Sequence, residues 1–133
     1  AMVGDEEESV IEHADWFGIE PGARAAARLL DRRPDTTAIV AANDLIALGC
    51  YRIARDRGLD IGSDLSVTGY NDMPLADLVE PALTTIRVPF QSMGASAART
   101  LLGWIRGETD PDRTPAMLAP KLQARNSTGP PPA

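Results

Sequence analysis

Short apolar runs recur along the chain, and the stretches between them carry apolar residues at helical spacing. Short runs rich in Val, Ile and Leu, bounded by Gly, Pro, Asn or Asp, are typical of β-strands. This pattern predicts strands at residues 10–14, 37–42, 65–70 and 83–88, and an extended piece at 117–122.

Helical spacing and end signals define the segments between these strands. The first long helix is predicted between Pro21, which is favoured in a first helical turn, and Pro34, which ends it. The second begins at Asn43 or Asp44, both favoured as N-caps, and ends before Gly58, a left-handed C-cap. A short helical segment is predicted at 74–79, and a last long helix at 90–106.

Strands that alternate with helices favour a parallel sheet in an α/β domain. In such sheets ligands bind outside the carboxyl ends of the strands. The strings HADW, AAND and GYND follow three predicted strands, so one rim would carry Trp16, Asn43, Asp44, Asn71 and Asp72. Asn and Asp also favour helix caps and turns, so these positions fit either local structure or a ligand site.

The helix that follows AAND is apolar on more than one side. Ile46, Cys50 and Ile53 form one stripe, and Leu45 and Leu48 widen it. A helix of this kind packs against more than one neighbour, which indicates a subunit partner.

Composition excludes several classes of protein. The 133 residues suffice for one domain, and a hydrophobic content of 44% argues against disorder. The net charge is −6, with an acidic run at residues 5–8, and the chain has no basic stripe that would grip nucleic acid. No apolar run is long enough to span a membrane, and the acidic start is unlike a signal peptide.

Cysteine and histidine are too scarce for disulfide or metal chemistry. Cys50 is the only cysteine, which excludes an internal disulfide and fits a reducing compartment such as the cytoplasm. His13 is the only histidine, and no spacing of ligands suggests a metal site. We therefore expect no metal and no cofactor.

A combination of strings is specific to one family. The strings AANDLIALG, RGLDIGSDLSVTGYND and PALTTI follow one another in this order, and together they strongly resemble the lac repressor/galactose repressor family of bacterial transcriptional regulators. The resemblance runs from about residue 10 to residue 128.

This resemblance implies a periplasmic-binding-protein-like effector domain, in which two α/β lobes close on a small molecule such as a sugar or a nucleobase. It implies a cytoplasmic, homodimeric regulator that is not an enzyme. A separate N-terminal helix-turn-helix, absent from this chain, would bind DNA. Ligand binding would favour one arrangement of the lobes over another.

The resemblance also assigns roles to residues. Trp16 would stack on the effector, Asn43 and Asn71 would hydrogen-bond to it, and Phe90 would form an apolar wall. Asp44 would act as a cap or a supporting partner, and Asp72 as a turn residue. Many family members carry aspartate where this chain has Asn71. The implied dimer interface contains Leu45, Leu48, Leu78 and Val79.

By the same resemblance the fold is one incomplete lobe of three layers around a parallel sheet. Residues 10–128 would form the C-terminal portion of the effector domain, and residues 129–133 a loose tail. Residues 1–9 would be an acidic end that begins with a tag remnant. The helix at 90–106 would pack on the other lobe. Most of that lobe is missing from this chain, and so is one inner strand of this lobe. Open sheet edges favour dimerisation, by exchange of this helix or by strand pairing.

Three alternatives stay open from the sequence. The chain could belong to a periplasmic sugar-binding protein of a transport system. It could be a domain that only self-associates and has no working pocket. The third is a small hydrolase with Cys50 as nucleophile, His13 as base and Asp15 as orienting group.

Overall fold

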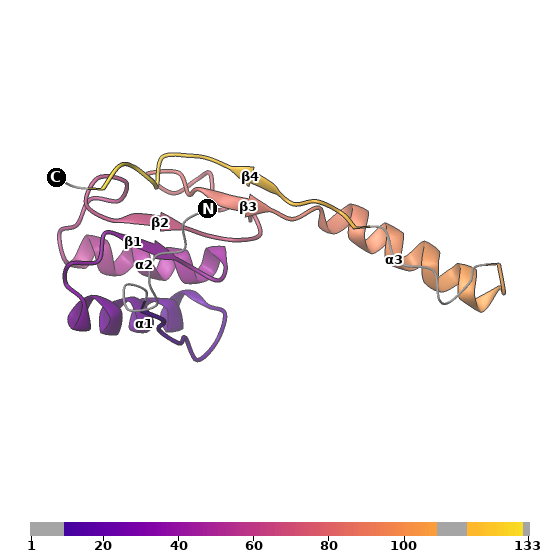
Figure 1. The fold of residues 1–133 in the computed structure, drawn as a ribbon, viewed down its shortest axis with the longest axis horizontal. Helices are drawn as coiled ribbons and strands as arrows, with labels where there is room; N and C mark the ends of the chain where they lie inside the picture. The colour runs from indigo at the N-terminus through magenta and orange to yellow at the C-terminus, as the bar shows by residue number, and fades with distance from the viewer. Residues whose placement is uncertain (1–9, 109–116, 132–133) are drawn as a thin grey trace.

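The structure is a computed structural model that describes residues 10–108 and 117–131. The acidic run and the expected tag remnant lie outside these residues. Figure 1 shows the order of the elements. They are α1 (Ile19–Arg32), β1 (Ala38–Val40), α2 (Asp44–Asp56), β2 (Ser66–Thr68), β3 (Thr85–Arg87), α3 (Phe90–Ile105) and β4 (Lys121–Gln123).

The three long helices are confirmed, with the expected end signals on α2. The side chain of Asn43 caps α2, because its Oδ1 accepts a hydrogen bond from the N–H of Ile46 at 2.8 Å. Gly58 follows the helix with a positive φ of 68°. Of the two residues offered as the cap, Asn43 therefore takes the role, and Asp44 is the first residue of the helix.

The strand predicted at 10–14 is wrong. This segment has no strand pairing, and side chains fix it on α1 instead. Glu12 accepts hydrogen bonds from Arg28 Nε at 2.7 Å and from Arg32, and Asp15 accepts one from Arg24 at 3.0 Å. Arginines spaced at i and i+4 on α1 thus hold the segment against the helix.

The helix predicted at 74–79 is also wrong, because this segment forms separate turns. The N–H of Ala76 bonds to the carbonyl of Met73 at 2.8 Å, and the N–H of Leu78 to that of Leu75 at 3.2 Å. The carbonyl of Ala76 accepts instead from the N–H of Leu83 at 2.7 Å, which draws the chain directly into β3. Tertiary pairing therefore replaces a continuous helix.

The strands form two two-stranded sheets, of which β1–β2 is parallel and β3–β4 is antiparallel. β1 and β2 pair in parallel with Ile39 opposite Val67, and an isolated parallel bridge between Thr68 and Thr84 joins β2 to the chain entering β3. The extended piece expected at 117–122 becomes β4, which pairs antiparallel with β3 at residues 121–123. All strands are shorter than the apolar runs predicted.

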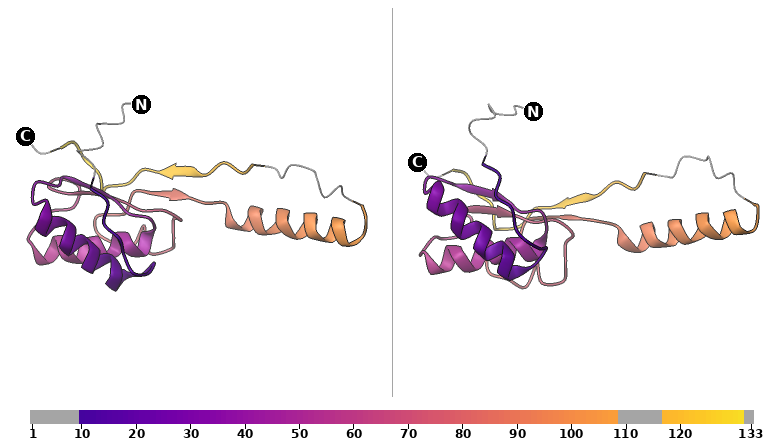
Figure 2. Two further views of the ribbon diagram at one scale, coloured as in Figure 1. Left: turned by 60° about the horizontal axis from the view of Figure 1, so that its bottom comes forward. Right: turned by 90° about the horizontal axis from the view of Figure 1, so that it is seen from below.

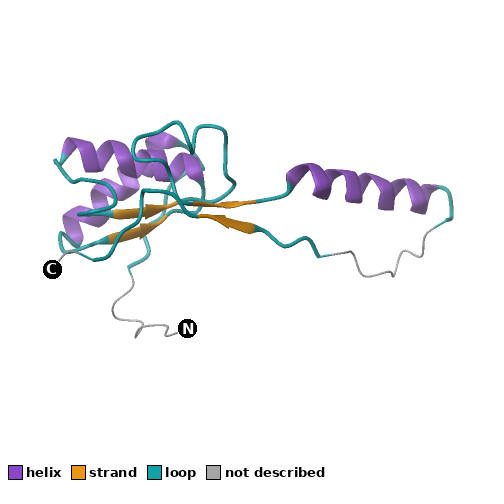
Figure 3. Ribbon diagram, turned by 90° about the horizontal axis from the view of Figure 1, so that it is seen from above, coloured by secondary structure: helices purple, strands orange, loops and turns teal. Residues whose placement is uncertain are grey.

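Helices α1 and α2 lie on the same side of the sheet and close the core (Figures 1 and 3). They approach closely because both contribute glycines: a Cβ on Gly22 would lie 2.7 Å from Ile46 Cα, and a Cβ on Gly49 would overlap the backbone of α1. The opposite face of the sheet exposes Val40 and Leu122, which are 86% and 64% accessible. The buried apolar cluster contains Ala26, Leu30, Ala41, Ala47, Cys50, Ala54, Leu65, Val67, Ala76 and Leu83.

α3 projects from this body as an arm, as the two views of Figure 2 show. β3 leads directly into it, and β4 runs alongside β3 on the return. The apolar side chains of α3 are largely exposed, among them Phe90, Met93, Leu101, Leu102, Trp104 and Ile105. That this helix packs on another lobe remains a prediction.

Candidate functional site

Four segments meet at the carboxyl ends of the parallel strands. The side-chain nitrogen of Asn43 lies 3.5 Å from the carbonyl of Phe17, and the N–H of Asp44 bonds to the carbonyl of Tyr70 at 3.1 Å. The N–H of Asn71 bonds to the carbonyl of Ile86 at 2.9 Å. These contacts join residues 16–17, 43–44, 70–72 and 86–90 into one surface, which we call the rim.

Trp16 presents an apolar ring at the rim. Its side chain is 74% exposed and meets the ring of Phe17 edge-on, with centroids 6.3 Å apart. The ion pairs of Glu12 and Asp15 with α1 hold the chain just before it. An exposed, anchored indole suits stacking on the C–H face of a sugar or on a flat ring.

Asn43 has a structural role at both ends of its carboxamide. Its Oδ1 caps α2 and its Nδ2 donates to the carbonyl of Phe17, so the second N–H of the amide is the part able to reach a ligand. The position is half-buried at the N-terminus of a helix, where the helix dipole favours an electron-rich partner. Capping and ligand contact are therefore compatible at Asn43.

Asn71 and Asp72 form a tight turn with positive φ angles of 115° and 56°. Asn and Asp tolerate this region better than other non-glycine residues, which explains the residue types locally. The turn is held by the backbone bond of Asn71 to Ile86 and by a parallel bridge to Arg87. The half-buried side chain of Asn71 stands at the end of β2 in the rim.

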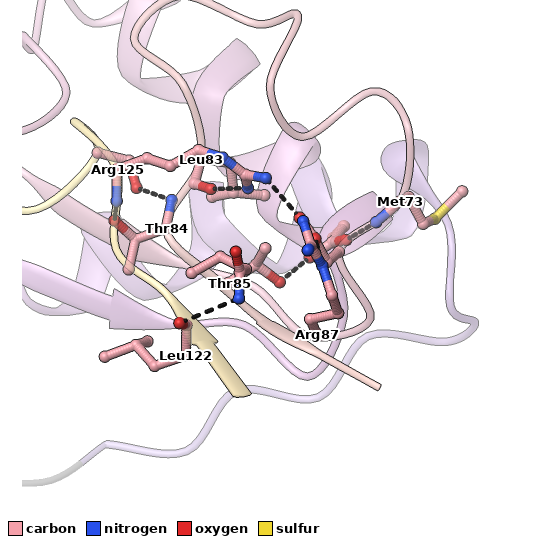
Figure 4. Close-up of polar contacts among 11 residues, drawn as sticks. Met73, Leu83, Thr84, Thr85, Arg87, Leu122 and Arg125 are labelled. Atoms are coloured by element: carbon pink, nitrogen blue, oxygen red, sulfur yellow. Dashed lines mark hydrogen bonds and ion pairs between the residues drawn. The ribbon is translucent and has the colours of Figure 1, made fainter. Parts of the chain in front are cut away.

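Asp72 does more than the turn role expected of it, because its carboxylate binds two arginines. Arg87 Nε donates to one oxygen at 2.5 Å and Arg125 to the other at 2.6 Å, and the carboxylate is only 5% exposed. Figure 4 shows the side chains of Arg87 and Arg125 converging there. Burial alone would raise the pKa of Asp72, but hydrogen bonds from Arg125 and Arg87 outweigh it and lower that pKa.

Asp44 is a buried carboxylate that supports the rim through hydrogen bonds. It is 1% exposed and accepts hydrogen bonds from Thr85 Oγ1 at 2.5 Å and from the N–H of Met73 at 2.7 Å. Figure 4 shows Thr85 and Met73 on the two sides of this contact. Asp44 thus links the start of α2 to β3 and to the segment after the turn, as a supporting partner rather than the cap.

Phe90 lies where β3 passes into α3. It is the first residue of the helix, and its side chain is 56% exposed. The ring therefore offers apolar surface at the start of α3. That it forms an apolar wall against a ligand remains a prediction.

The four candidate ligand contacts do not share one cavity in this structure. Trp16 lines a hollow of about 870 Å³ between residues 10–17, α1 and β1. A second hollow of about 390 Å³ lies over the strand ends and is lined by Tyr70, Ile86 and Leu122. The rim is therefore an open surface flanked by two hollows.

Cys50 is a core residue, as expected. It is 2% exposed, and burial raises the pKa of its thiol to about 12, so the nucleophilic thiolate is disfavoured. Over residues 10–108 and 117–131, no group of three or more His, Cys, Asp and Glu side chains could hold a metal ion. Nor is any helix in those ranges long and apolar enough to cross a membrane.

Part of this network of aspartates and their partners leaves no signal in the sequence. Arg125 lies 53 residues from Asp72, and an arginine in a polar stretch before the tail is unremarkable by itself. Thr85 and Arg87 are two residues apart on a predicted strand, a spacing that places both side chains on the same face of the sheet. Only the fold brings them to the two aspartates.

Comparison with known proteins identifies the family. A family model described as a periplasmic binding protein-like domain matches residues 3–128. The chain belongs to the periplasmic binding protein-like domain family. Members of this family that resemble the chain include transcriptional regulators, so the resemblance to the lac repressor/galactose repressor family is confirmed.

Three relatives illustrate the match. The HTH-type transcriptional regulator MalR of Streptomyces coelicolor is 42% identical over 92% of this chain, which spans 34% of that protein. The lactose operon repressor of Rhizobium radiobacter is 41% identical over 66% of this chain and 78% of its own length. A LacI family regulator from Arthrobacter sp. FB24, solved with lactose, is 31% identical with a TM-score of 0.77 over 84% of this chain and 42% of its own. The chain thus spans about a third of the first relative.

Proposed function

We propose that this chain is the effector-sensing and dimer-forming portion of a cytoplasmic, sugar-responsive transcriptional regulator. DNA binding would belong to a helix-turn-helix elsewhere in the whole protein, and no catalytic step is assigned to the chain. The proposal is supported by the similarity to MalR and to a regulator solved with lactose. It favours regulation over transport, because the named relatives are regulators.

One observation carries the assignment of the site. An exposed tryptophan, two asparagines and an exposed phenylalanine come from four separate segments, and backbone and side-chain contacts hold those segments together. An aromatic face with carboxamides beside it is the chemistry that recognises a sugar: C–H groups pack on the ring, and hydroxyls bond to the amides. Trp16, Asn43, Asn71 and Phe90 are the proposed contacts.

Titration with lactose and other mono- and disaccharides, followed by tryptophan fluorescence and calorimetry, tests this site. At least one sugar should give a saturable change. Trp16→Ala and Asn71→Ala should abolish it, whereas Trp104→Phe on α3 and Asn126→Ala, away from the rim, should not. Unchanged affinity in both rim variants would refute the assigned contacts.

We propose a homodimer interface over Leu45, Leu48, Leu78 and Val79. Leu78 is 75% exposed, and Leu45 and Leu48 are half-buried on α2, so each leaves apolar surface that a partner could cover. Sedimentation equilibrium should give a dimer that Leu78→Asp weakens. The change Met117→Asp, at a residue 95% exposed elsewhere, serves as the control. A monomer at every concentration would contradict the interface.

A further inference from the structure

The chain enters α3 from the body through a short segment and returns to the body through β4, which pairs with β3. On the outward path, β3 ends at Arg87 and α3 begins at Phe90. On the return path, β4 ends at Gln123 and Arg125 follows two residues later. The direction in which α3 projects therefore depends on what fixes the end of β3, and the β4 segment paired with it, against the body.

One carboxylate grips both segments. Arg87 binds one oxygen of Asp72 and Arg125 binds the other, and Arg125 also donates to the carbonyl of Leu83 at 2.7 Å. The group is nearly buried, so water screens its two ion pairs less than it would exposed pairs. This arrangement differs from the other ion pairs of the described residues, whose acidic side chains are 14% to 73% exposed.

The same turn also bonds to β3 through the backbone. The N–H of Asn71 reaches the carbonyl of Ile86, the residue before Arg87. A displacement of Asn71 is thus transmitted to the end of β3 by a main-chain bond and by the side chain of the next residue. Phe90, the first residue of α3, follows three residues after Arg87.

We propose that Asp72 is a positioning residue that sets the direction of α3 by clamping Arg87 and Arg125, and so couples the turn at Asn71 to α3. The clamp does not depend on which ligand the rim binds. If the proposed sugar site is correct, a ligand drawn to Asn71 acts on the same segments that orient α3. A ligand that binds more tightly when α3 points in one direction than in another would then shift the population toward that direction.

Spin labels report the direction of α3 without any ligand. Arg55 on α2 and Arg99 on α3 are exposed, and Arg55→Cys with Arg99→Cys gives one labelled pair in the full chain, while native Cys50 is 2% exposed. The distance distribution between the labels should be narrow in this parent protein. Asp72→Asn should broaden it and shift its maximum.

Matched variants separate clamping from general destabilisation. Leu30→Ala weakens the buried core away from the clamp and should lower stability while leaving the distribution unchanged. Arg87 is 56% exposed, so Arg87→Gln should fold and still broaden the distribution, and Arg87→Lys should largely restore it. An unchanged distribution in both Asp72→Asn and Arg87→Gln, or broadening in Leu30→Ala of the same size, overturns the proposal. Sugar titration of the parent tests the ligand site separately.

Discussion

Replacement of Asp44 by alanine tests whether the rim is braced by one buried carboxylate. The change leaves two donors without their acceptor, the hydroxyl of Thr85 and the N–H of Met73. A buried group that loses its partner costs about 1–3 kcal/mol, and Thr85 is 1% exposed. Met73 is half-buried and can recruit water, so its share is smaller. We expect Asp44→Ala to lower the free energy of unfolding by about 2–4 kcal/mol.

Asparagine at the same position provides a conservative comparison. Its side-chain oxygen can accept from Met73, and its amide can donate to the Thr85 hydroxyl once that hydroxyl turns to act as acceptor. Both bonds survive without the charge, so Asp44→Asn should cost about 1–2 kcal/mol.

Urea unfolding followed by circular dichroism measures the loss of stability in each variant. The exposed Asp77→Ala serves as a surface control and should change the free energy of unfolding by less than about 0.5 kcal/mol. A cost below about 1 kcal/mol for Asp44→Ala, with an unchanged denaturant slope, would show that the rim does not depend on this carboxylate.

Three further outcomes are expected. Gly49→Val should destabilise the chain strongly or prevent folding, because a Cβ there overlaps the backbone of α1, whereas Gly58→Asn should be tolerated at an open left-handed cap; thermal melts compare the two. Cys50 should resist iodoacetamide in the folded protein and react once urea unfolds it, as mass spectrometry would record, since the thiol is buried with a pKa raised to about 12. The folded-state pKa of Asp72 is lowered by its two arginines. The difference in unfolding free energy between the parent and Asp72→Asn should therefore be complete above the unfolded-state pKa of about 3.9, and it should vanish as pH falls through the folded-state pKa. A difference that grows on acidification would contradict the ion pairs.

Local chemistry determined the parts of the fold that the sequence predicts correctly. Asn43 caps α2 through a bond to a residue three positions on, and Gly58 ends it by adopting a conformation that glycine enters at no steric cost. The apolar spacing of α1 and α2 fixed the faces that meet in the core. These features depend on neighbours within one or two helical turns, so a single sequence contains them.

Tertiary contacts decided what the pattern predicted wrongly or left open. Residues 10–14 look like a strand but are tied to α1 by ion pairs, and residues 74–79 give up a helix because Ala76 pairs with Leu83. The antiparallel course of β4 likewise depends on where the chain returns after α3.

The site divides in the same way. Residue type, position and the family resemblance predict four ligand contacts, Trp16, Asn43, Asn71 and Phe90. Their contacts with a ligand remain a proposal. The clamp of Asp72 with Arg87 and Arg125 joins residues 15 and 53 positions apart. Its strength comes from burial and from simultaneous pairing, and neither exists until the chain has folded, so only the tertiary structure could place it.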